Sequence, residues 1–395
     1  MLAALLLMGF AEGADSTEGR LVKAGDILAA VERGDSLEYD GAIVEGDLDL
    51  SGVGRLADVH FNDTVFEGSV NFEGVEFAGN AWFEKAKFSG GNADFSYVKF
   101  SGGDADFYFA EFSEGYADFT EAEFSGDAYF SETEFSGRCA FFPNAVFWGD
   151  VAFDYAEFSK QPSFINATFE NVSFYGTKFG GNAYFDNAIV RGSLNLTRTE
   201  YPRLFLPWKL IDKEQLSCSN YDAYLAMVRN YANLGWYEDS NDCYFEYRNK
   251  CRAAEGILSA EGFLDSIEWI VYGYGVRPLR TLAWMLGLVL LFGLLFRNDG
   301  SIKKYIRVET ERAVEESGDS VAVEIQTTLQ RGELTLIDPF LFSLSTFTSG
   351  LSSFLYPSFE YRAEKHARLV ILERLLGSVA IAIFITAISK TYLIR

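Results

Sequence analysis

A run of hydroxyl-bearing residues near the C-terminal end is the part of the sequence whose oxygens could bind an ion. Hydroxyl and backbone carbonyl oxygens can replace the hydration shell of an inorganic cation. The candidate pore and filter residues are Thr346, Thr348, Ser349, Gly350, Leu351, Ser352 and Ser353. Because this run lies between two apolar segments, it is predicted to line an ion path.

Those apolar segments predict a membrane domain over residues 261–395. Residues 279–296 and 369–389 each approach the length of about 20 apolar residues that a membrane-spanning helix needs. Between them lies a polar connection, followed by residues 338–357, where a short apolar helix leads into a Ser/Gly loop. Non-helical backbone at membrane depth is tolerated only where protein or water surrounds it, so this segment is predicted to be re-entrant and pore-like. We therefore expect a multi-pass protein of the cell membrane, with the lipid bilayer as its partner.

Residues 278–395 resemble the two-span pore module of the potassium-channel superfamily. The matching residues are Phe342-Ser343-Leu344 and Thr346-Phe347-Thr348, at the end of the family's pore helix, and Pro357, after its filter. The resemblance implies a homotetramer around a path for an inorganic cation. A potassium filter needs several glycines, and the corresponding positions here hold only Gly350, so we expect any ion passage to be weakly selective.

Two residues of the second apolar segment also stand out. Glu373 is an acid within a span, which is a functional hypothesis by default, although pairing near the membrane interface explains it equally well. Gly377 is a candidate hinge or a point of close helix packing.

The sequence offers little for catalysis, metal binding or nucleic-acid binding. His60 and His366 are its two histidines, and its four cysteines form no C-x-x-C pair, so no zinc constellation is present. No nucleophile, base and orienting group recur together, and we expect no catalytic residue, no metal and no cofactor. The net charge of -24 argues against nucleic acid as a partner. A disulfide among Cys218, Cys243 and Cys251 is one alternative, and it would imply an oxidising compartment.

The N-terminal half is organised by a repeat of large apolar residues. From Leu50 to Leu196 they recur at gaps of 11 or 12 residues, with one gap of 10, and a second series of phenylalanines lies five residues behind the first. In units such as Ala93-Asp94-Phe95, alternation places Ala and Phe on one side of the chain and the acid on the other. We therefore expect buried phenylalanines such as Phe107 and exposed acids, and glycine at the corners, because glycine permits sharp turns. The acids concerned are Asp94, Asp106 and Asp118.

Residues 40–197 resemble the pentapeptide-repeat family, whose units read roughly Ala-Asp/Asn-Leu/Phe-x-x. The resemblance implies a right-handed, four-sided β-solenoid, a β-helix of about six or seven coils stacked about 4.8 Å apart. The fold class predicted for the whole chain is thus mainly β-solenoid, joined to an α-helical hairpin and a two-span α-helical membrane domain.

The remaining segments are assigned by their composition. Residues 1–14 are predicted as a signal segment, 20–39 as a helical cap on the first coil, and 198–260 as a linker containing a hairpin of two helices. The basic residues between the spans favour an extracytoplasmic solenoid by the positive-inside rule, whereas the channel resemblance implies a cytoplasmic one. We favour the extracytoplasmic side.

Three functions follow from these features. The first is a membrane pore with the solenoid as an accessory domain. The second is a structural or interaction protein in which the spans anchor the acidic rod and conduct nothing. The third, mimicry of DNA by the rod, would need a cytoplasmic solenoid and would not need the two spans.

Overall fold

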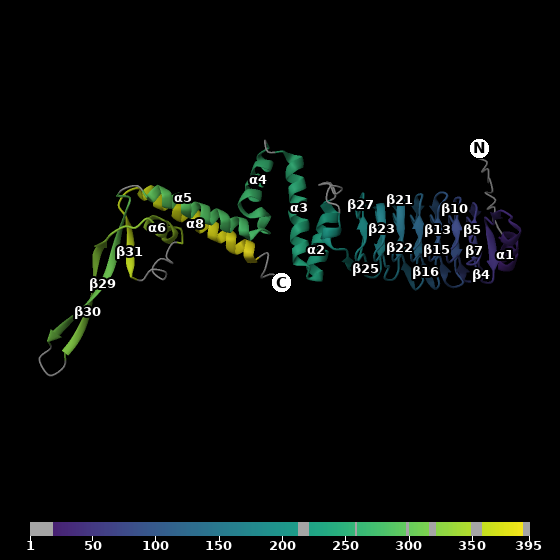
Figure 1. The fold of residues 1–395 in the computed structure, drawn as a ribbon, viewed down its shortest axis with the longest axis horizontal. Coiled ribbons are helices and arrows are strands. Elements are labelled where there is room, and N and C mark those ends of the chain that lie inside the picture. The colour runs from purple at the N-terminus through teal and green to yellow at the C-terminus, as the bar shows by residue number, and fades with distance from the viewer. Residues whose placement is uncertain are drawn as a thin grey trace, which may run out of the picture. The chain divides into compact units, whose positions relative to one another are not determined.

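The computed structural model describes residues 19–211, 221–256, 259–297, 300–315, 321–348 and 358–389. The signal segment predicted for residues 1–14 lies outside them. The chain divides into two compact units, Met1–Ser240 and Asn241–Arg395, which are considered separately below. The first unit is a solenoid with helical ends, and the second is a helical assembly with a small antiparallel sheet (Figure 1).

The solenoid is built from short parallel strands, four to each coil, so it is four-sided as predicted. One face is the eight-stranded sheet β1 (Arg20–Lys23), β3 (Ala42–Glu45), β7 (Val65–Phe66), β11 (Lys87–Phe88), β15 (Glu111–Phe112), β19 (Glu134–Phe135), β22 (Glu157–Phe158) and β24 (Lys178–Phe179). A second face contains β4 (Leu48–Asp49), β8 (Val70–Asn71), β12 (Ala93–Asp94), β16 (Tyr116–Asp118) and β20 (Cys139–Phe141), and further along it β25 (Ala183–Tyr184) pairs with β28 (Leu204–Phe205).

The other two faces belong to one thirteen-stranded sheet, because β21 (Val146–Ala152) and β23 (Thr168–Ser173) continue around the corner that separates them. One of these faces holds β2 (Leu37–Glu38), β6 (Val59–His60), β10 (Ala81–Trp82), β14 (Ala105–Asp106), β18 (Ala128–Tyr129) and β27 (Leu194–Asn195). The other holds β5 (Arg55–Leu56), β9 (Glu76–Phe77), β13 (Lys99–Phe100), β17 (Glu123–Phe124) and β26 (Ile189–Val190).

The solenoid has about eight turns, more than the six or seven expected. The repeat counted from the sequence begins at Leu50, but β1 pairs with β3 in register and adds a strand before the first recognisable unit. At the other end, β28 pairs with β25 beyond the last unit, although the local sequence no longer shows the period. Backbone pairing therefore continues past both ends of the side-chain pattern.

The phenylalanines form the predicted core. Phe107 is fully buried, and its ring stacks on Phe83 at a centroid distance of 5.0 Å and on Phe130 at 4.9 Å, almost parallel in both cases. Its contacts across the coil, to Phe95 and Phe119, are edge-to-face at 5.4 and 5.5 Å. Both geometries are favourable for aromatic pairs, so ring contacts stabilise the interior along the solenoid axis and across each coil.

The acids of the repeat do not simply face water, which corrects the expectation for Asp94, Asp106 and Asp118. Each is half-buried, and its Oδ1 accepts the backbone N–H two residues ahead. Partial burial raises the pKa of Asp106, against the effect of the hydrogen bond from Tyr108. These acids hold the turn that follows each strand.

The turns themselves also differ from the expectation that glycine makes the corners. At Phe107-Tyr108-Phe109-Ala110 the N–H of Ala110 donates to the carbonyl of Phe107, and Phe109 has φ 56°. This is the geometry of a type II turn, which normally favours glycine at its third position. The non-glycine solenoid residues with positive φ are Asp63, Lys85, Tyr97, Phe109, Glu121, Glu132, Asn144, Tyr155, Asn166, Asn187 and Arg198.

Glycine is needed at other corners for a different reason. A Cβ atom on Gly90 would lie 1.8 Å from the carbonyl oxygen of Glu67, and one on Gly102 would lie 1.7 Å from that of Ala78. Neither distance is sterically allowed. These glycines therefore let the chain pass against the backbone of the preceding coil.

Side-chain hydrogen bonds also join neighbouring coils along one corner. The N–H groups of Asp104, Asp127 and Asp150 donate to the side-chain oxygens of Asn80, Asp104 and Asp127 respectively, at 3.0, 2.9 and 2.8 Å. We call Asp58, Asn80, Asp104, Asp127, Asp150 and Asn171 the Asx column. Each of its members bonds to the coil that follows.

Helices close both ends of the solenoid. At the N-terminal end α1 (Ala24–Arg33), which lies within the cap predicted for residues 20–39, buries Ile27, contacts β4 and ends at Gly34 in a left-handed conformation. At the C-terminal end, beyond η1 (Trp208–Leu210), lies α2 (Tyr221–Leu234). The side-chain amide of Asn230 bonds to both the N–H and the carbonyl of Leu204, at 3.0 and 2.8 Å. The helix α2, expected to be part of a spacer, thus covers the edge of β28 as a second cap.

The second unit contains the remaining helices and a three-stranded sheet. After α3 (Tyr237–Glu255), which crosses the boundary between the units, come α4 (Ala260–Tyr272), η2 (Gly273–Gly275), α5 (Pro278–Phe296), α6 (Asp338–Phe347) and α8 (Ala367–Ile388). The strands β29 (Ile302–Glu315), β30 (Val321–Gly332) and β31 (Phe359–Ala363) pair antiparallel, with β29 in the middle. The polar connection between the apolar segments is therefore a long β-hairpin.

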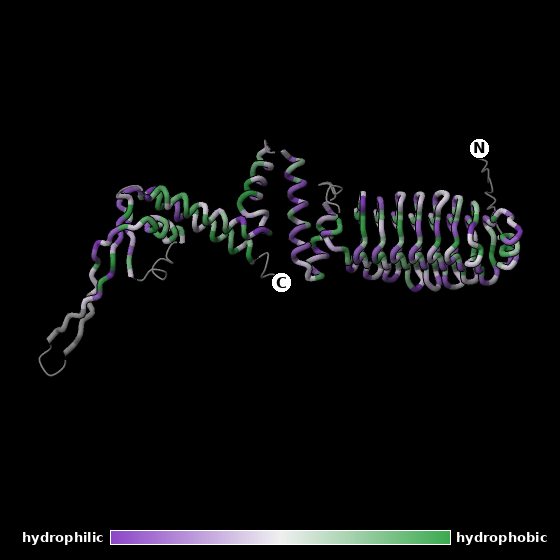
Figure 2. The backbone as a smooth tube through the Cα atoms, viewed as in Figure 1, coloured by the Kyte–Doolittle hydropathy of each residue, from purple (hydrophilic) through white to green (hydrophobic). Residues whose placement is uncertain are grey.

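Two helices of the described residues, α5 and α8, are long and apolar enough to cross a membrane, each with a mean hydropathy of 2.1. Figure 2 shows the hydrophobic colour over both. The helix α5 encloses the first expected span, 279–296, and α8 covers the second, 369–389, except for its last residue.

The close approach of coils at Gly102 gives the first prediction. Gly102→Ala should lower the thermal unfolding temperature of the solenoid by several degrees, because its Cβ would overlap a backbone oxygen and one coil would have to shift.

The matched control is Gly52→Ala, whose Cβ meets nothing within 4 Å. It should leave the unfolding temperature nearly unchanged when both variants are followed by circular dichroism. Equal losses in the two variants would contradict the close contact between coils.

The Asx column gives the second prediction. Asp127→Asn keeps an oxygen acceptor for the N–H of Asp150 and removes a charge from beside Asp104, so the free energy of unfolding should stay the same or rise. Asp127→Ala loses the acceptor and should cost about 1 kcal/mol. Glu114→Ala, at an exposed corner position, is the control and should cost less than about 0.5 kcal/mol. Denaturant unfolding measures all three, and equal effects of Asn and Ala at position 127 would contradict the hydrogen-bond role.

Candidate functional site

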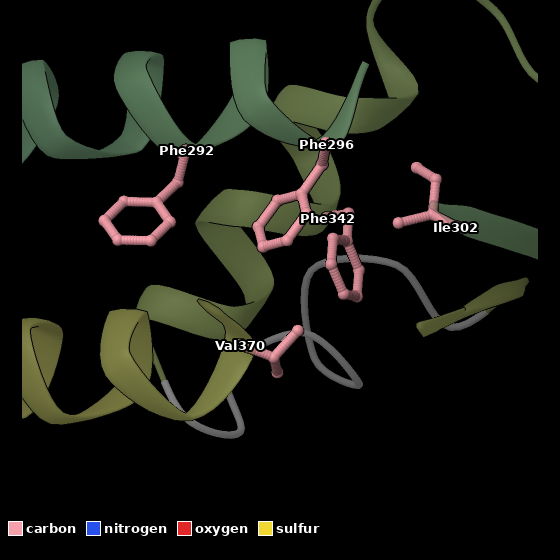
Figure 3. Packing of buried hydrophobic residues seen from close by; sticks show 5 residues of the cluster. All are labelled: Phe292, Phe296, Ile302, Phe342 and Val370. Carbon is pink, nitrogen blue, oxygen red and sulfur yellow. The ribbon is translucent and has the colours of Figure 1, made fainter. Parts of the chain in front are cut away.

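The short helix α6 lies between α5 and α8 and is held there by an apolar cluster. The cluster comprises Phe292 and Phe296 of α5, Ile302 of β29, Phe342 of α6 and Val370 of α8 (Figure 3). The rings of Phe296 and Phe342 meet edge-to-face at 4.9 Å. One side of α6 therefore faces both long helices.

Glycines bring the long helices close to α6. A Cβ on Gly293 would lie 2.4 Å from the ring of Phe340, and one on Gly377 would lie 2.3 Å from the carbonyl oxygen of Phe347. A side chain at position 377 would move α6 away, whereas one at position 293 would displace the ring of Phe340. Gly377, singled out from the sequence as a hinge or packing point, is thus a point of close backbone approach.

A polar contact lies within the same three-helix packing. Ser343 and Glu373 are fully buried, and the Ser343 Oγ lies within hydrogen-bond distance of Glu373 Oε1 and 2.9 Å from the carbonyl oxygen of Val289. The second carboxyl oxygen, Glu373 Oε2, has no hydrogen-bond partner in the described part of the chain. Glu373 therefore points at α6, whereas the sequence left pairing near the membrane interface equally open.

The structure describes two of the candidate pore and filter residues. Thr346 is buried, and the Thr348 hydroxyl donates to the carbonyl of Leu344 at 2.8 Å, so this hydroxyl is bonded within its own helix. The others, Ser349, Gly350, Leu351, Ser352 and Ser353, lie outside the described residues. The end of α6 is thus placed, and the loop predicted to form the filter stays a prediction.

Aromatic and arginine side chains gather where α3, α4 and α5 meet in the second unit. The Arg280 guanidinium lies 5.1 Å from the ring centroid of Trp269 and 5.0 Å from that of Phe245, and it donates to the Trp269 carbonyl at 2.9 Å. Arg248 lies over the ring of Tyr274 and pairs with Asp265. The side chain of Arg280 is therefore held between aromatic rings and a backbone carbonyl.

The cysteines and other metal-ligating residues are now partly placed. Cys251 is disulfide-bonded, Cys243 is a buried thiol, and Cys218 lies outside the described residues. Across the described ranges, no three His, Cys, Asp or Glu side chains converge as metal ligands would.

Sequence analysis missed the group that fixes the start of α6. Asp338 is buried and accepts hydrogen bonds from Lys304 Nζ at 3.0 Å, from the Tyr361 hydroxyl at 2.6 Å, and from the backbone and hydroxyl of Thr335. It thereby ties α6 to β29 and β31. The signal that could have found it is the Thr335-x-x-Asp338 spacing, which matches the sequence signature of a capping box.

These bonds set the ionisation of Asp338. Partial burial acts to raise its pKa, but the hydrogen bonds from Thr335, Tyr361 and Lys304 outweigh it, and the pKa is lowered. A lowered pKa means that the folded state favours the carboxylate. The stability it contributes is present above the ordinary aspartate pKa and is lost as the pH falls through the folded value.

The third prediction follows from that sign. Asp338→Asn should reduce the free energy of unfolding at neutral pH by about 1 to 3 kcal/mol, because several hydrogen bonds lose a charged acceptor. Its unfolding should also be less sensitive to acid below about pH 4 than that of the wild type. Unfolding in detergent across pH measures both effects. Glu364→Gln removes only an exposed pair with Lys303 and should change little, and an equal effect of the two variants would count against the role of Asp338.

Comparison with known proteins bears on the solenoid. A family model described as pentapeptide repeats (9 copies) matches residues 55–99 and 142–189. The coils between these stretches, around Phe107 and Phe130, stack in the same way. No curated protein and no solved structure matches the chain. Folds of this repeat are typically structural or mediate interactions. The solenoid of this chain is therefore a pentapeptide-repeat domain.

Proposed function

We propose that the protein is a membrane-embedded, channel-like protein that carries its pentapeptide-repeat solenoid as an accessory domain. The observation that carries the proposal is the position of α6. With its 10 residues, α6 is about 15 Å long, half the thickness of a bilayer core, yet it is packed between two helices of spanning length. A short buried helix between two spans is the arrangement expected of a pore helix.

The surfaces of α5 and α8 support insertion into lipid. Most residues of both helices are exposed, and the exposed set is apolar on α5 and mostly apolar on α8, where Arg368, Arg374, Ser378 and Thr386 are the exceptions. On α5 it includes Leu279, Leu286, Leu290 and Leu294, and on α8 it includes Ile371, Leu375, Val379 and Ile385. Apolar area of this extent is unfavourable in water and favourable in a bilayer. Both helices thus act as spans of a multi-pass protein of the cell membrane.

An ion path in such a protein lies between subunits. Within one chain the space between α5, α6 and α8 is filled by the Phe292, Phe296 and Phe342 cluster. A path for a cation would therefore form on a symmetry axis, and the tetramer implied by the channel resemblance provides one. With Gly350 as the one glycine of the loop, we propose weak cation selectivity.

A non-conducting anchor is the second candidate, and the disulfide at Cys251 favours it. Disulfides persist mainly in oxidising compartments, and Cys251 precedes α5 on the same side of the span as the solenoid. The solenoid would then be extracytoplasmic, as the basic residues between the spans indicate, and the topology would be the reverse of the potassium-channel pattern. In this case the acidic rod would be the working surface and the spans would only hold it.

Conduction by glycine variants is the fourth prediction and tests the proposal. The purified full-length protein in planar bilayers, under a potassium/sodium gradient, should pass cation current with a reversal potential near zero. Gly377→Ala should abolish this current, because the Cβ would push α6 away from α8. A silent wild type across voltage, pH and calcium would favour the anchor, and a reversal potential at the potassium equilibrium value would overturn weak selectivity.

The matched control is Gly287→Ala on α5, where a Cβ meets nothing within 4 Å. It should conduct as the wild type does. Loss of current in both variants would point to general damage to the helices and not to the position of α6.

A further inference from the structure

The number of hydrogens available where Ser343 meets Glu373 determines which group donates a hydrogen bond and which accepts. Ser343 carries one hydroxyl hydrogen, yet its Oγ lies within bonding distance of two acceptors, the carbonyl oxygen of Val289 and Glu373 Oε1. A carbonyl oxygen can only accept, and an ionised carboxylate can only accept. Both contacts become hydrogen bonds when the carboxyl of Glu373 carries a proton and donates it to Ser343, while Ser343 donates to Val289.

The surroundings of Glu373 supply no charge to replace that proton. The carboxyl is fully buried, and in the described part of the chain no cation pairs with it. The charged residues on the three helices around it are Asp338 on α6, Arg280 on α5, and Arg368 and Arg374 on α8. Asp338 is bonded to Lys304, Arg280 lies against Trp269 and Phe245, and Arg368 and Arg374 are exposed.

The loop after α6 adds no charged residue to this set, because residues 349–357 contain no Asp, Glu, Lys, Arg or His. A buried carboxylate without a cation is strongly unfavourable. Loss of the proton would also take the Ser343 hydrogen away from Val289 and leave that carbonyl without it. The links from α6 to α5 and to α8 would therefore weaken together.

We propose that Glu373 is a proton-binding site that fastens α6 between α5 and α8. In the protonated state a chain of hydrogen bonds runs from Glu373 through Ser343 to Val289 and joins all three helices. In the deprotonated state the carboxylate draws toward water and α6 loosens. The inference concerns the packing of α6 and holds whether or not the protein conducts.

Hydrogen exchange of α6 is the fifth prediction and tests the site. The full-length protein in lipid nanodiscs is exchanged between about pH 5 and about pH 9, and rates are corrected for the intrinsic pH dependence of exchange to give protection factors. Wild-type α6 should lose protection by about tenfold or more as the pH rises. Glu373→Gln, whose neutral amide can still donate to Ser343, should keep α6 protected and change less than about twofold.

A serine pair supplies the matched control. Ser343→Ala breaks the link to α5 and α8 and should leave α6 weakly protected at every pH. Ser345→Ala removes a hydroxyl that bonds only to the Phe342 carbonyl of its own helix, and it should follow the wild type. Identical pH profiles for wild type and Glu373→Gln would overturn the proposal.

The outcome is separable from that of the proposed function. A pH-dependent α6 in a protein that passes no current would support the proton site and reject the channel. Current together with an α6 protection that does not change with pH, in wild type and in Glu373→Gln alike, would support the channel and reject the proton site.

Discussion

The spacing between stacked aromatic rings sets the geometry of the solenoid. Parallel strands of neighbouring coils lie about 4.8 Å apart, and the rings of Phe88 and Phe112 or of Phe107 and Phe130 repeat at 4.5 and 4.9 Å. The same residue type can therefore occupy the same place in coil after coil without gaps or overlap. Close approach at Gly90 and Gly102, side-chain bonds in the Asx column and capping by α1 and α2 all presuppose this common step.

The two units use glycine for one shared purpose, which is to bring backbone against backbone. In the solenoid Gly102 lets one coil pass over the carbonyl of Ala78 in the coil before it. In the membrane unit Gly377 lets α8 pass against the carbonyl of Phe347 at the end of α6. At both sites the atom that an added methyl group would meet is a backbone carbonyl oxygen. The substitution would therefore displace a whole coil or helix and not just a neighbouring side chain.

The sequence predicts those parts of the structure that repeat or that are long and uniform. The phenylalanine period gives the solenoid, and continuous apolarity gives α5 and α8. It does not predict Phe109 at positive φ, because the stacking of coils imposes that turn against the local preference of the residue. It does not predict β29, because that strand is rich in charge, nor the pairing of β29 with β30. The partners of Asp338 are also not predicted, since they come from segments distant in the chain. Local patterns carry no information about such distant pairings.

The Asx column has a consequence for how this domain can vary in length. The side chain of each member bonds to the coil that follows, and the two caps contact the ends of the solenoid, α1 through β1, β2 and β4 and α2 through β28. A coil can therefore be removed or duplicated as a whole while every remaining contact keeps its partner type. The length of the solenoid therefore changes in steps of about 4.8 Å per coil. Evolution or design can set this length through the number of coils, without rebuilding either end.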